Sequence, residues 1–307
     1  MSTPAFFDLQ VNGYGGVDFN QDDLTADALH RACERVEADG VAGILATIIT
    51  DNLERMTRRL AALVRLREQD PLAKRVIAGL HIEGPFISPV KGYVGAHPAD
   101  AVRRANADEM KRLLDAGGGL TRLVTLAPEV DDGAKVTRML AKQGVCVSAG
   151  HTDASLVDLR AAIDAGLTLF THLGNGCPME MNRHDNIIQR ALSLCDRLRI
   201  MFIADGVHVP YVALRNYIRL CGTERSIVVS DAVAPAGLGP GRYTLGRWDL
   251  LIGDDMVARA PDGSHFVGSA MTMQQAYANL TGPVGLSPAE ATRLTRDNPM
   301  RAIGLKD

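Results

Sequence analysis

Residues 76–85 read VIAGLHIEGP, an almost uninterrupted apolar run that reaches Glu83 and is followed by a glycine and a proline. A run of this length is typical of a strand that is buried on both faces of a sheet. Similar runs recur along the chain, so that eight strands are predicted in all. Their bounds are Ala5–Val11, Gly43–Ile49, Val76–Ile82, Leu120–Leu126, Val145–Ala149, Leu167–Thr171, Ile200–Ala204 and Ser226–Ser230.

Helical periodicity fills most of the intervals between the predicted strands. One helix is expected to begin after Thr25, a suitable N-cap, and to stop at Gly40. Another is expected after Asp51, which is predicted to cap it, with Glu54 where a capping box requires an acid. Strands that alternate with helices predict an α/β fold in which a parallel sheet closes into a (β/α)8 TIM-like barrel. An open doubly wound sheet is the alternative.

The chain is expected to form a single barrel domain over residues 1–307. Residues 237–263, after the eighth predicted strand, are punctuated by glycine and proline and contain two strand-like runs, Tyr243–Leu245 and Asp249–Ile252. This pattern predicts a small hairpin insertion in the barrel.

Composition excludes several classes of protein. The 307 residues include 33 Lys and Arg against 36 Asp and Glu, and a formal net charge of -3 offers no excess positive charge to a nucleic acid. The five cysteines include no C-x-x-C pair, which argues against a disulfide framework or a structural zinc knuckle. The sequence pattern predicts neither a secretory signal nor an apolar segment that spans a bilayer, so a cytoplasmic protein without a membrane partner is expected.

Polar residues follow several of the predicted strands, and Glu83, His151, His172 and Asp231 each stand at the end of a different one. In a (β/α)8 barrel the carboxyl ends of the strands meet at one mouth, where active sites lie. A carboxylate with two imidazoles suits Zn²⁺ or a similar divalent ion that keeps one position open for water. Asp231, opposite them, is suited to accept a proton from the attacking water and to return it to the leaving group. The alternative is structural: Glu83 braces the turn at Gly84, and Asp231 caps the segment that follows it.

Longer motifs carry a resemblance to a known family. The matching stretches are DLQVNG (8–13), GLHIEGPF (79–86), GAHP (95–98), GHT (150–152), THLGN (171–175), IADGVH (203–208), VSDAVAPAG (229–237) and GSAMTM (268–273). Over nearly its whole length, and in the family's order, the chain resembles the N-acetylglucosamine-6-phosphate deacetylases of the amidohydrolase superfamily.

The resemblance implies roles for individual residues. Glu83, His151 and His172 match the family's ligands to one divalent ion, for which Zn²⁺ is expected and Fe²⁺, Mn²⁺ or Co²⁺ would also serve. Asp231 matches the general base and acid, and His97 matches the histidine that polarises the amide carbonyl. The positions that match the sugar-phosphate site are Asn175, Gly176, Arg183 and His208. In the family the arginine reaches the neighbouring subunit's site, which implies a homodimer.

The implied activity is the metal-dependent removal of acetate from N-acetylglucosamine-6-phosphate or a close N-acetylamino sugar phosphate. Glu180 and Asp185 add negative charge near the expected phosphate. A deacylase of a different N-acyl substrate, with or without a phosphate group, is therefore one alternative. A catalytically inactive barrel that senses a sugar is the other.

The chain departs from the family in two further respects. Gln10 and Asn12 stand where many amidohydrolases have a His-x-His pair that supports a second metal ion. Because a neutral amide is a poorer ligand than an imidazole, these residues are expected to be the remnant of a second metal site, and one ion is expected. The family's small β-sandwich is expected to be absent or vestigial, since few residues precede Ala5 and the sequence ends at Asp307.

Overall fold

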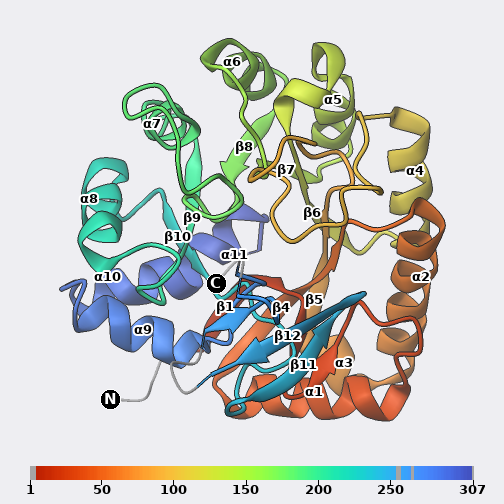
Figure 1. Cartoon of the computed structure of the whole chain (residues 1–307). Helices are drawn as coiled ribbons and strands as arrows, with labels where there is room; N and C mark the ends of the chain where they lie inside the picture. The colour runs from red at the N-terminus through yellow and green to blue at the C-terminus, as the bar shows by residue number, and fades with distance from the viewer. Residues whose placement is uncertain (1–4, 254–256, 264–265, 306–307) are drawn as a thin grey trace.

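The computed structural model describes residues 5–253, 257–263 and 266–305. A sheet of eight parallel strands forms its centre, with helices around it (Figure 1). In sheet order the strands are β1 (Phe6–Val11), β4 (Val41–Ile49), β5 (Ile77–Glu83), β6 (Thr121–Leu126), β7 (Cys146–Ala149), β8 (Leu167–Phe170), β9 (Arg199–Ile203) and β10 (Ser226–Val229). Each predicted strand corresponds to one of these, and the predicted barrel is confirmed over the open sheet.

The barrel closes where its last strand meets its first. Val11 forms a parallel bridge with Ala232, and the Asn12 N–H donates to the Ala232 carbonyl at 2.7 Å. Nearby, the Ser230 N–H donates to the Asp8 carboxylate at 3.2 Å, and the Ser230 hydroxyl donates to the same carboxylate. A buried side chain therefore completes the seam between β10 and β1.

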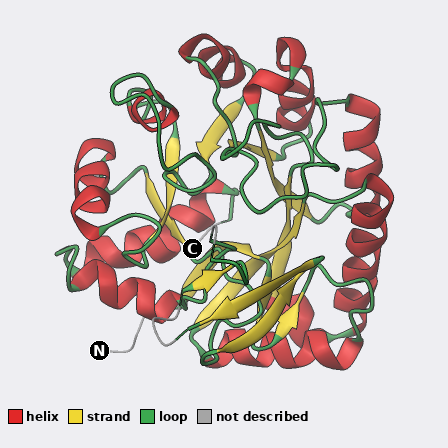
Figure 2. Cartoon of the chain, in the orientation of Figure 1, coloured by secondary structure: helices red, strands yellow, loops and turns green. Residues whose placement is uncertain are grey.

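Helices connect the strands and cover the outside of the sheet, as Figure 2 shows. They are α1 (Ala26–Ala38), α2 (Leu53–Gln69), α3 (Pro71–Val76), α4 (Ala107–Ala116), α5 (Lys135–Lys142), α6 (Leu156–Asp164), α7 (Ile187–Leu192), α8 (Tyr211–Cys221), α9 (Met273–Thr281), α10 (Pro288–Thr292) and α11 (Asn298–Ala302). None of the helices within the described residues has the length and apolar character needed to cross a membrane.

One predicted helix cap is confirmed and another is wrong. Thr25 caps α1, since its hydroxyl oxygen accepts from the Ala28 N–H at 3.2 Å. The cap of α2 is Asn52, not Asp51, because the Asn52 side-chain oxygen accepts from the Glu54 N–H at 2.9 Å. The Asp51 carboxylate is buried and bound by guanidinium groups, which explains why it does not cap the helix.

A three-stranded antiparallel sheet lies in the stretch where the insertion is predicted. Its strands are β11 (Gly241–Leu245), β12 (Trp248–Ile252) and β13 (Ala258–Arg259). β11 and β12 form the expected hairpin, and β13 adds a strand that the sequence pattern did not indicate. The inner face of this sheet packs on Ile49, the last residue of β4. The insertion therefore lies over the carboxyl ends of the barrel strands.

A two-stranded ribbon, β2 (Gly13–Tyr14) and β3 (Val17–Asp18), follows β1.

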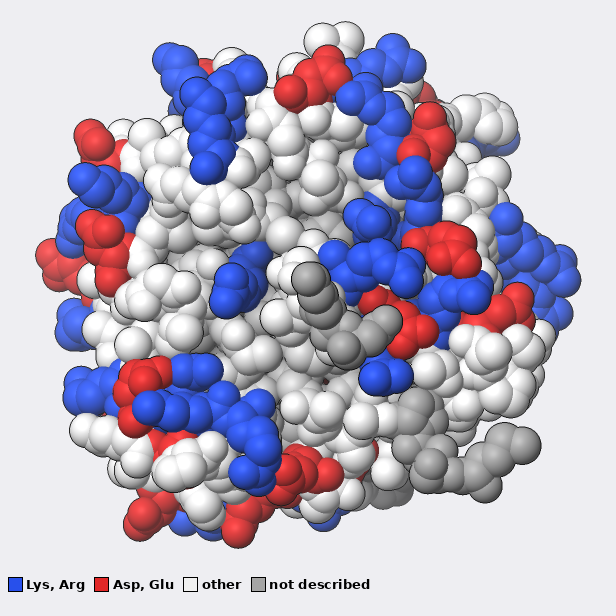
Figure 3. Space-filling view, turned by 180° about the vertical axis from the view of Figure 1, so that it is seen from behind, with Lys and Arg blue, Asp and Glu red and all other residues white. Residues whose placement is uncertain are grey.

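Charged side chains are mixed on the face that Figure 3 presents, which is opposite to the view of Figure 1. Basic and acidic groups lie side by side there, with no field of a single sign over the whole face. Exposed ion pairs such as Arg75 with Glu37, at 2.9 Å, illustrate this mixing along the chain. The distribution agrees with the nearly balanced composition.

Replacing Asp8 tests the buried carboxyl at the barrel seam. Burial raises the pKa of Asp8 to about 7 from 3.8, although hydrogen bonds from Ser230 and Gln10 lower it. Between those pH values the native state holds a proton that the unfolded chain has lost, so stability falls as the pH rises. We compare the free energy of unfolding of the wild type with that of Asp8→Asn at each pH. The wild type should lose up to about 4 kcal/mol relative to the variant between pH 4 and pH 8. Urea denaturation at each pH measures the difference.

Asp27→Asn, at an exposed position in the first turn of α1, is the matched control. Its difference from the wild type should stay nearly constant over the same pH range. A constant difference for Asp8→Asn as well would contradict the assignment of a buried, protonated carboxyl to the seam.

Candidate active site

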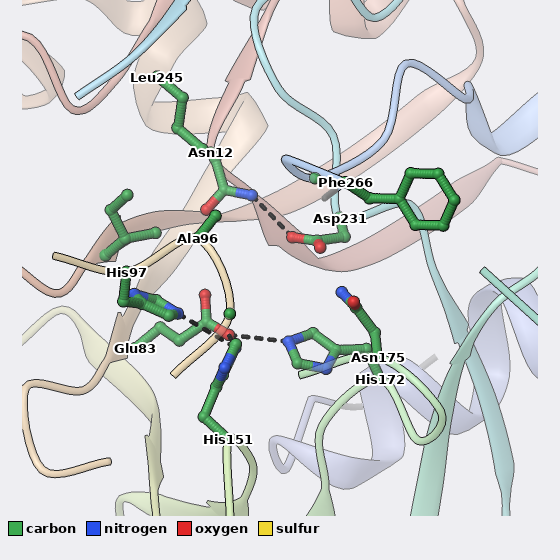
Figure 4. Close-up of a pocket in the computed structure, with 13 residues that line it drawn as sticks. Asn12, Glu83, Ala96, His97, His151, His172, Asn175, Asp231, Leu245 and Phe266 are labelled. Atoms are coloured by element: carbon green, nitrogen blue, oxygen red, sulfur yellow. Dashed lines mark hydrogen bonds and ion pairs between the residues drawn. The ribbon is translucent and has the colours of Figure 1, made fainter. Parts of the chain in front are cut away.

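A pocket opens at the carboxyl ends of the barrel strands (Figure 4). Glu83 is the last residue of β5, and His151, His172 and Asp231 each lie two residues beyond the end of β7, β8 and β10. All four line the pocket, as do the predicted residues His97, Asn175 and Asn12. The topology therefore brings together residues that are far apart in the sequence.

The carboxylate of Glu83 is the hub of the site. It is buried, and its Oε1 atom lies 2.9 Å from His172 Nε2 and 3.3 Å from His151 Nε2. The Gln10 side-chain N–H donates to the same oxygen at 3.2 Å. Burying a carboxylate is costly unless charges or hydrogen-bond donors surround it, and here three side chains converge on one oxygen.

The donor atoms are spaced like the ligands of one ion. Tetrahedral ligands at about 2.0–2.1 Å from a zinc ion lie about 3.3 Å from one another. The distances from Glu83 Oε1 to the two imidazole nitrogens are close to this value, and His97 Nε2 lies 3.1 Å from His151 Nε2. Ligand atoms of Glu83, His97 and His151 all lie within 4.8 Å of one another. A divalent ion fits this group, in which His97 stands beside two of the three predicted ligands. The third predicted ligand, His172, contacts Glu83 but is not part of the group.

Hydrogen bonding determines which nitrogen of each ring carries the proton. His151 Nδ1 lies 2.9 Å from the Tyr93 carbonyl, which can only accept, so Nδ1 carries a proton. His151 Nε2 lies 3.3 Å from Glu83 Oε1 and 3.1 Å from His97 Nε2, so one of the two ring nitrogens in the second contact donates to the other. His151 therefore presents Nε2 to the site, next to Glu83 and His97.

Unpaired polar atoms mark the same region. Of seven buried side-chain nitrogen and oxygen atoms without a hydrogen-bond partner among the described residues, five belong to Gln10, Asn12, His97, His172 and His208. Because buried polar atoms are normally paired, their concentration here indicates a site built for a polar ligand.

Glu83 and Asp231 have pKa values that are shifted in opposite directions. Burial raises the pKa of Glu83, but hydrogen bonds from His151 and His172 outweigh it and hold the pKa well below its ordinary value. Burial raises the pKa of Asp231 to about 6, against the opposing effects of His172 and the Asn12 hydrogen bond. Burial, together with the charge of His151, lowers the pKa of His97 to about 3, so that ring is neutral near pH 7.

Backbone strain is concentrated at three site residues. Ala134, His151, His172 and Asp231 are the non-glycine residues with positive φ in the described chain, and the last three have values of 49°, 30° and 51°. Such conformations cost of order 1–3 kcal/mol each and persist where the surrounding structure enforces them. They turn each side chain from the end of its strand toward the pocket.

Gln10 and Asn12 lie close to the two carboxylates. The Asn12 side-chain N–H donates to Asp231 Oδ1 at 2.8 Å, and Gln10 donates to Glu83. A carboxylate only accepts, so in both contacts the amide nitrogen faces the acid. Where a His-x-His pair would bind a cation, this chain directs N–H donors at the acids. Their interpretation as a second-metal remnant stays a prediction.

The predicted sugar-phosphate residues are placed less uniformly. Asn175 lines the pocket. His208 lies beside it, with Nδ1 2.5 Å from Asp205, Nε2 unpaired and its ring 5.0 Å from that of the pocket residue Phe266. Gly176 packs on the His151 ring, where an added Cβ would come within 2.8 Å of Nδ1. Arg183 is exposed.

Sequence reasoning missed four apolar residues that line the pocket, Ile49, Ala96, Leu245 and Phe266. Leu245 and Phe266 come from the region of the insertion and the segment after it. No local signal identifies them, because their position depends on how the insertion folds back over the barrel.

Comparisons with known proteins identify relatives over almost the whole chain, although no protein-family model matches it. The N-acetylglucosamine-6-phosphate deacetylase of Homo sapiens is 35% identical over 99% of this chain and 74% of its own length. The N-acetylgalactosamine-6-phosphate deacetylase of Escherichia coli O157:H7 is 30% identical over 98% of this chain and 78% of its own.

A similar solved structure is a mutant N-acetyl-D-glucosamine-6-phosphate deacetylase from Mycobacterium smegmatis in complex with N-acetyl-D-glucosamine-6-phosphate. It is 34% identical, with a TM-score of 0.89, and the match covers 99% of this chain and 78% of that one. This chain thus spans about three quarters of the length of these proteins.

Metal content distinguishes the predicted ligands from the third imidazole. We expect His172→Ala to lower the affinity for Zn²⁺ at least 10-fold, because it removes a donor beside Glu83. His97→Ala should keep one bound ion per chain. Equilibrium dialysis followed by elemental analysis measures both.

His184→Ala, at an exposed position, controls for the general loss of a histidine and should bind like the wild type. If His97→Ala lost the ion while His172→Ala kept it, His97 would be a metal ligand and His172 would not.

Proposed function

Because the chain belongs to the N-acetylglucosamine-6-phosphate deacetylases, amide hydrolases of the amidohydrolase superfamily, we propose that it removes acetate from N-acetylglucosamine-6-phosphate or a close N-acetylamino sugar phosphate. The observation that carries this proposal is the pocket in which Glu83 and three imidazoles face Asp231. In Figure 4 these side chains point toward a common space, His97 from the loop after β5 and the others from the ends of four strands.

Glu83, His151 and His172 would hold one divalent ion, for which Zn²⁺ suits the ligands best and Fe²⁺, Mn²⁺ or Co²⁺ are compatible. When bound, such an ion supplies activation of a water molecule and polarisation of the amide carbonyl. The hydrogen bond from His151 Nδ1 to Tyr93 orients that ring, and Gln10 restrains Glu83 from the other side.

Asp231 transfers the proton that the reaction requires. Asn12 occupies its Oδ1 atom, so Oδ2 is free to accept a proton from the attacking water. Asp231 then delivers this proton to the amide nitrogen as the C–N bond breaks. This proton is needed because an amine leaves poorly as an anion. The products are a carboxylic acid and a free amine.

His97 stabilises the oxygen of the acyl group. Its ring is neutral, so one ring nitrogen carries a proton, and Nε2, which lies 3.1 Å from His151 Nε2, is the nitrogen that would donate to the carbonyl oxygen. This hydrogen bond strengthens as negative charge develops on that oxygen.

The sugar phosphate would bind on the side of Asn175 and His208. His208 is held by Asp205, which leaves its buried Nε2 atom for a polar group of the substrate. The negative charge of Asp185 is partly offset by Arg190 at 2.6 Å, which reduces repulsion of a phosphate. We infer that Gly176 contributes to this end of the site, and that exposed Arg183 reaches the neighbouring site of a homodimer.

Asp231→Asn tests the proton transfer. It should lower kcat for release of acetate from N-acetylglucosamine-6-phosphate by about 10³-fold, because the amide cannot carry the proton. Zn²⁺ binding should change little. Asp249→Asn, an exposed carboxylate on β12, is the control. A variant with more than a tenth of wild-type kcat would refute the role of Asp231.

Phosphate dependence tests the substrate. N-acetylglucosamine should be hydrolysed with kcat/KM at least 10²-fold below that of its 6-phosphate, and Arg183→Ala should reduce this preference. Arg160→Ala, on the exposed face of α6, should not. Equal kcat/KM for both compounds would favour a deacylase that acts on a non-phosphorylated substrate. If the metal-loaded protein hydrolysed no N-acyl substrate, a catalytically inactive barrel that senses a sugar would be favoured.

Mixing Arg183→Ala with Asp231→Asn tests whether the arginine acts across subunits. Each variant alone should be nearly inactive. Statistical exchange of subunits would restore about a quarter of wild-type activity, since half the dimers would have one intact site. Failure to complement, with dimers demonstrated by light scattering, would place Arg183 in its own subunit's site or outside any site.

A further inference from the structure

One side of the pocket is apolar and takes no part in the steps described above. It is formed by Ile49, Ala96 and Leu245. The three residues belong to one small apolar cluster, and Ile49 and Leu245 are 6% and 4% exposed. In Figure 4, Leu245 and Ala96 lie on the side of Asn12 and His97, whereas Phe266 and Asn175 lie on the other side of the pocket.

The insertion that supplies Leu245 is anchored firmly at its tip. The Gly246 N–H donates to Asp18 Oδ2 at 2.6 Å, and Arg247 Nη2 lies 2.8 Å from Asp51 Oδ1. The buried Asp51 is also bound by Arg59 at 3.0 Å. The turn that follows Leu245 is thus tied to Asp18 of β3 and to Asp51 after β4, which holds this apolar wall of the pocket in place.

The geometry of an amide indicates what this wall contacts. The carbonyl carbon is trigonal, so its oxygen, its nitrogen and its acyl substituent point in three directions about 120° apart. In the proposed function the oxygen is directed toward His97, and the nitrogen lies within reach of Asp231 with its sugar toward Asn175. The acyl substituent then occupies the part of the pocket that Ile49, Ala96 and Leu245 line, on the side away from Asn175.

Building on the proposed function, we propose that Ile49, Ala96 and Leu245 form the acyl subsite and that Leu245 restricts the substrate to short, uncharged N-acyl groups. A methyl group fits an apolar wall that offers it no polar partner. A longer chain meets the buried Leu245 side chain, whose backbone cannot yield because the hairpin tip is anchored. A charged acyl group would lose its hydration there without compensation.

Comparing acyl lengths tests the subsite. The substrates are the N-formyl, N-acetyl, N-propionyl and N-butyryl derivatives of glucosamine 6-phosphate, with kcat/KM measured from release of the free amine. Leu245→Ala should raise the butyryl-to-acetyl ratio of kcat/KM at least 10-fold. Leu251→Ala makes the same change at an exposed position of the same sheet and should leave the ratio within twofold of the wild type.

A second variant acts in the opposite direction and does not weaken the hairpin. Ala96→Val narrows the wall from the half-buried loop after β5 and should raise the formyl-to-acetyl ratio at least 10-fold. If both Leu245→Ala and Ala96→Val kept the wild-type acyl preference, the subsite assignment would be wrong. A wild-type protein that hydrolysed none of the four compounds would instead refute the proposed function.

Discussion

A buried carboxylate, Glu83, is the constraint around which this molecule is organised. Only 3% of the residue is exposed, so water cannot balance its charge. Its partners come from the first, fifth and sixth strands of the barrel, as Gln10, His151 and His172. An acid so placed is stable only with those donors or with a cation in their midst. The barrel must therefore close in register for this group to be tolerated.

The strain at the site is supported by backbone hydrogen bonds from adjacent loops. The carbonyl of each positive-φ site residue accepts an N–H: His151 from Ser88 at 2.9 Å, His172 from Asn175 at 2.8 Å and Asp231 from Ser269 at 2.9 Å. The loops that line the pocket thus also hold the residues that act in it. Rigid support of this kind keeps donors and acceptors aligned before a substrate arrives.

The insertion completes the pocket. Strand ends of a parallel barrel bring polar groups to one mouth, but they leave that mouth open to water. β11 and β12 place Leu245 over it and are tied down by Arg247 on Asp51. An apolar cover lowers the local dielectric around Glu83 and Asp231, which strengthens their interactions with donors.

The amino-acid sequence by itself determined the strands, their order and the residues at their carboxyl ends, because these follow from local apolar periodicity and from the topology of a parallel barrel. It therefore predicted that Glu83, His151, His172 and Asp231 would meet. Only the tertiary structure decided which atoms they present to one another, that Gln10 and Asn12 direct N–H groups at the acids, and that Leu245 forms a wall. Asp51 illustrates the reason: its local sequence favours a helix cap, but Arg247, 196 residues away, binds its carboxylate. Contacts between residues so far apart in the sequence form only when the whole chain has folded, and no local sequence pattern encodes them.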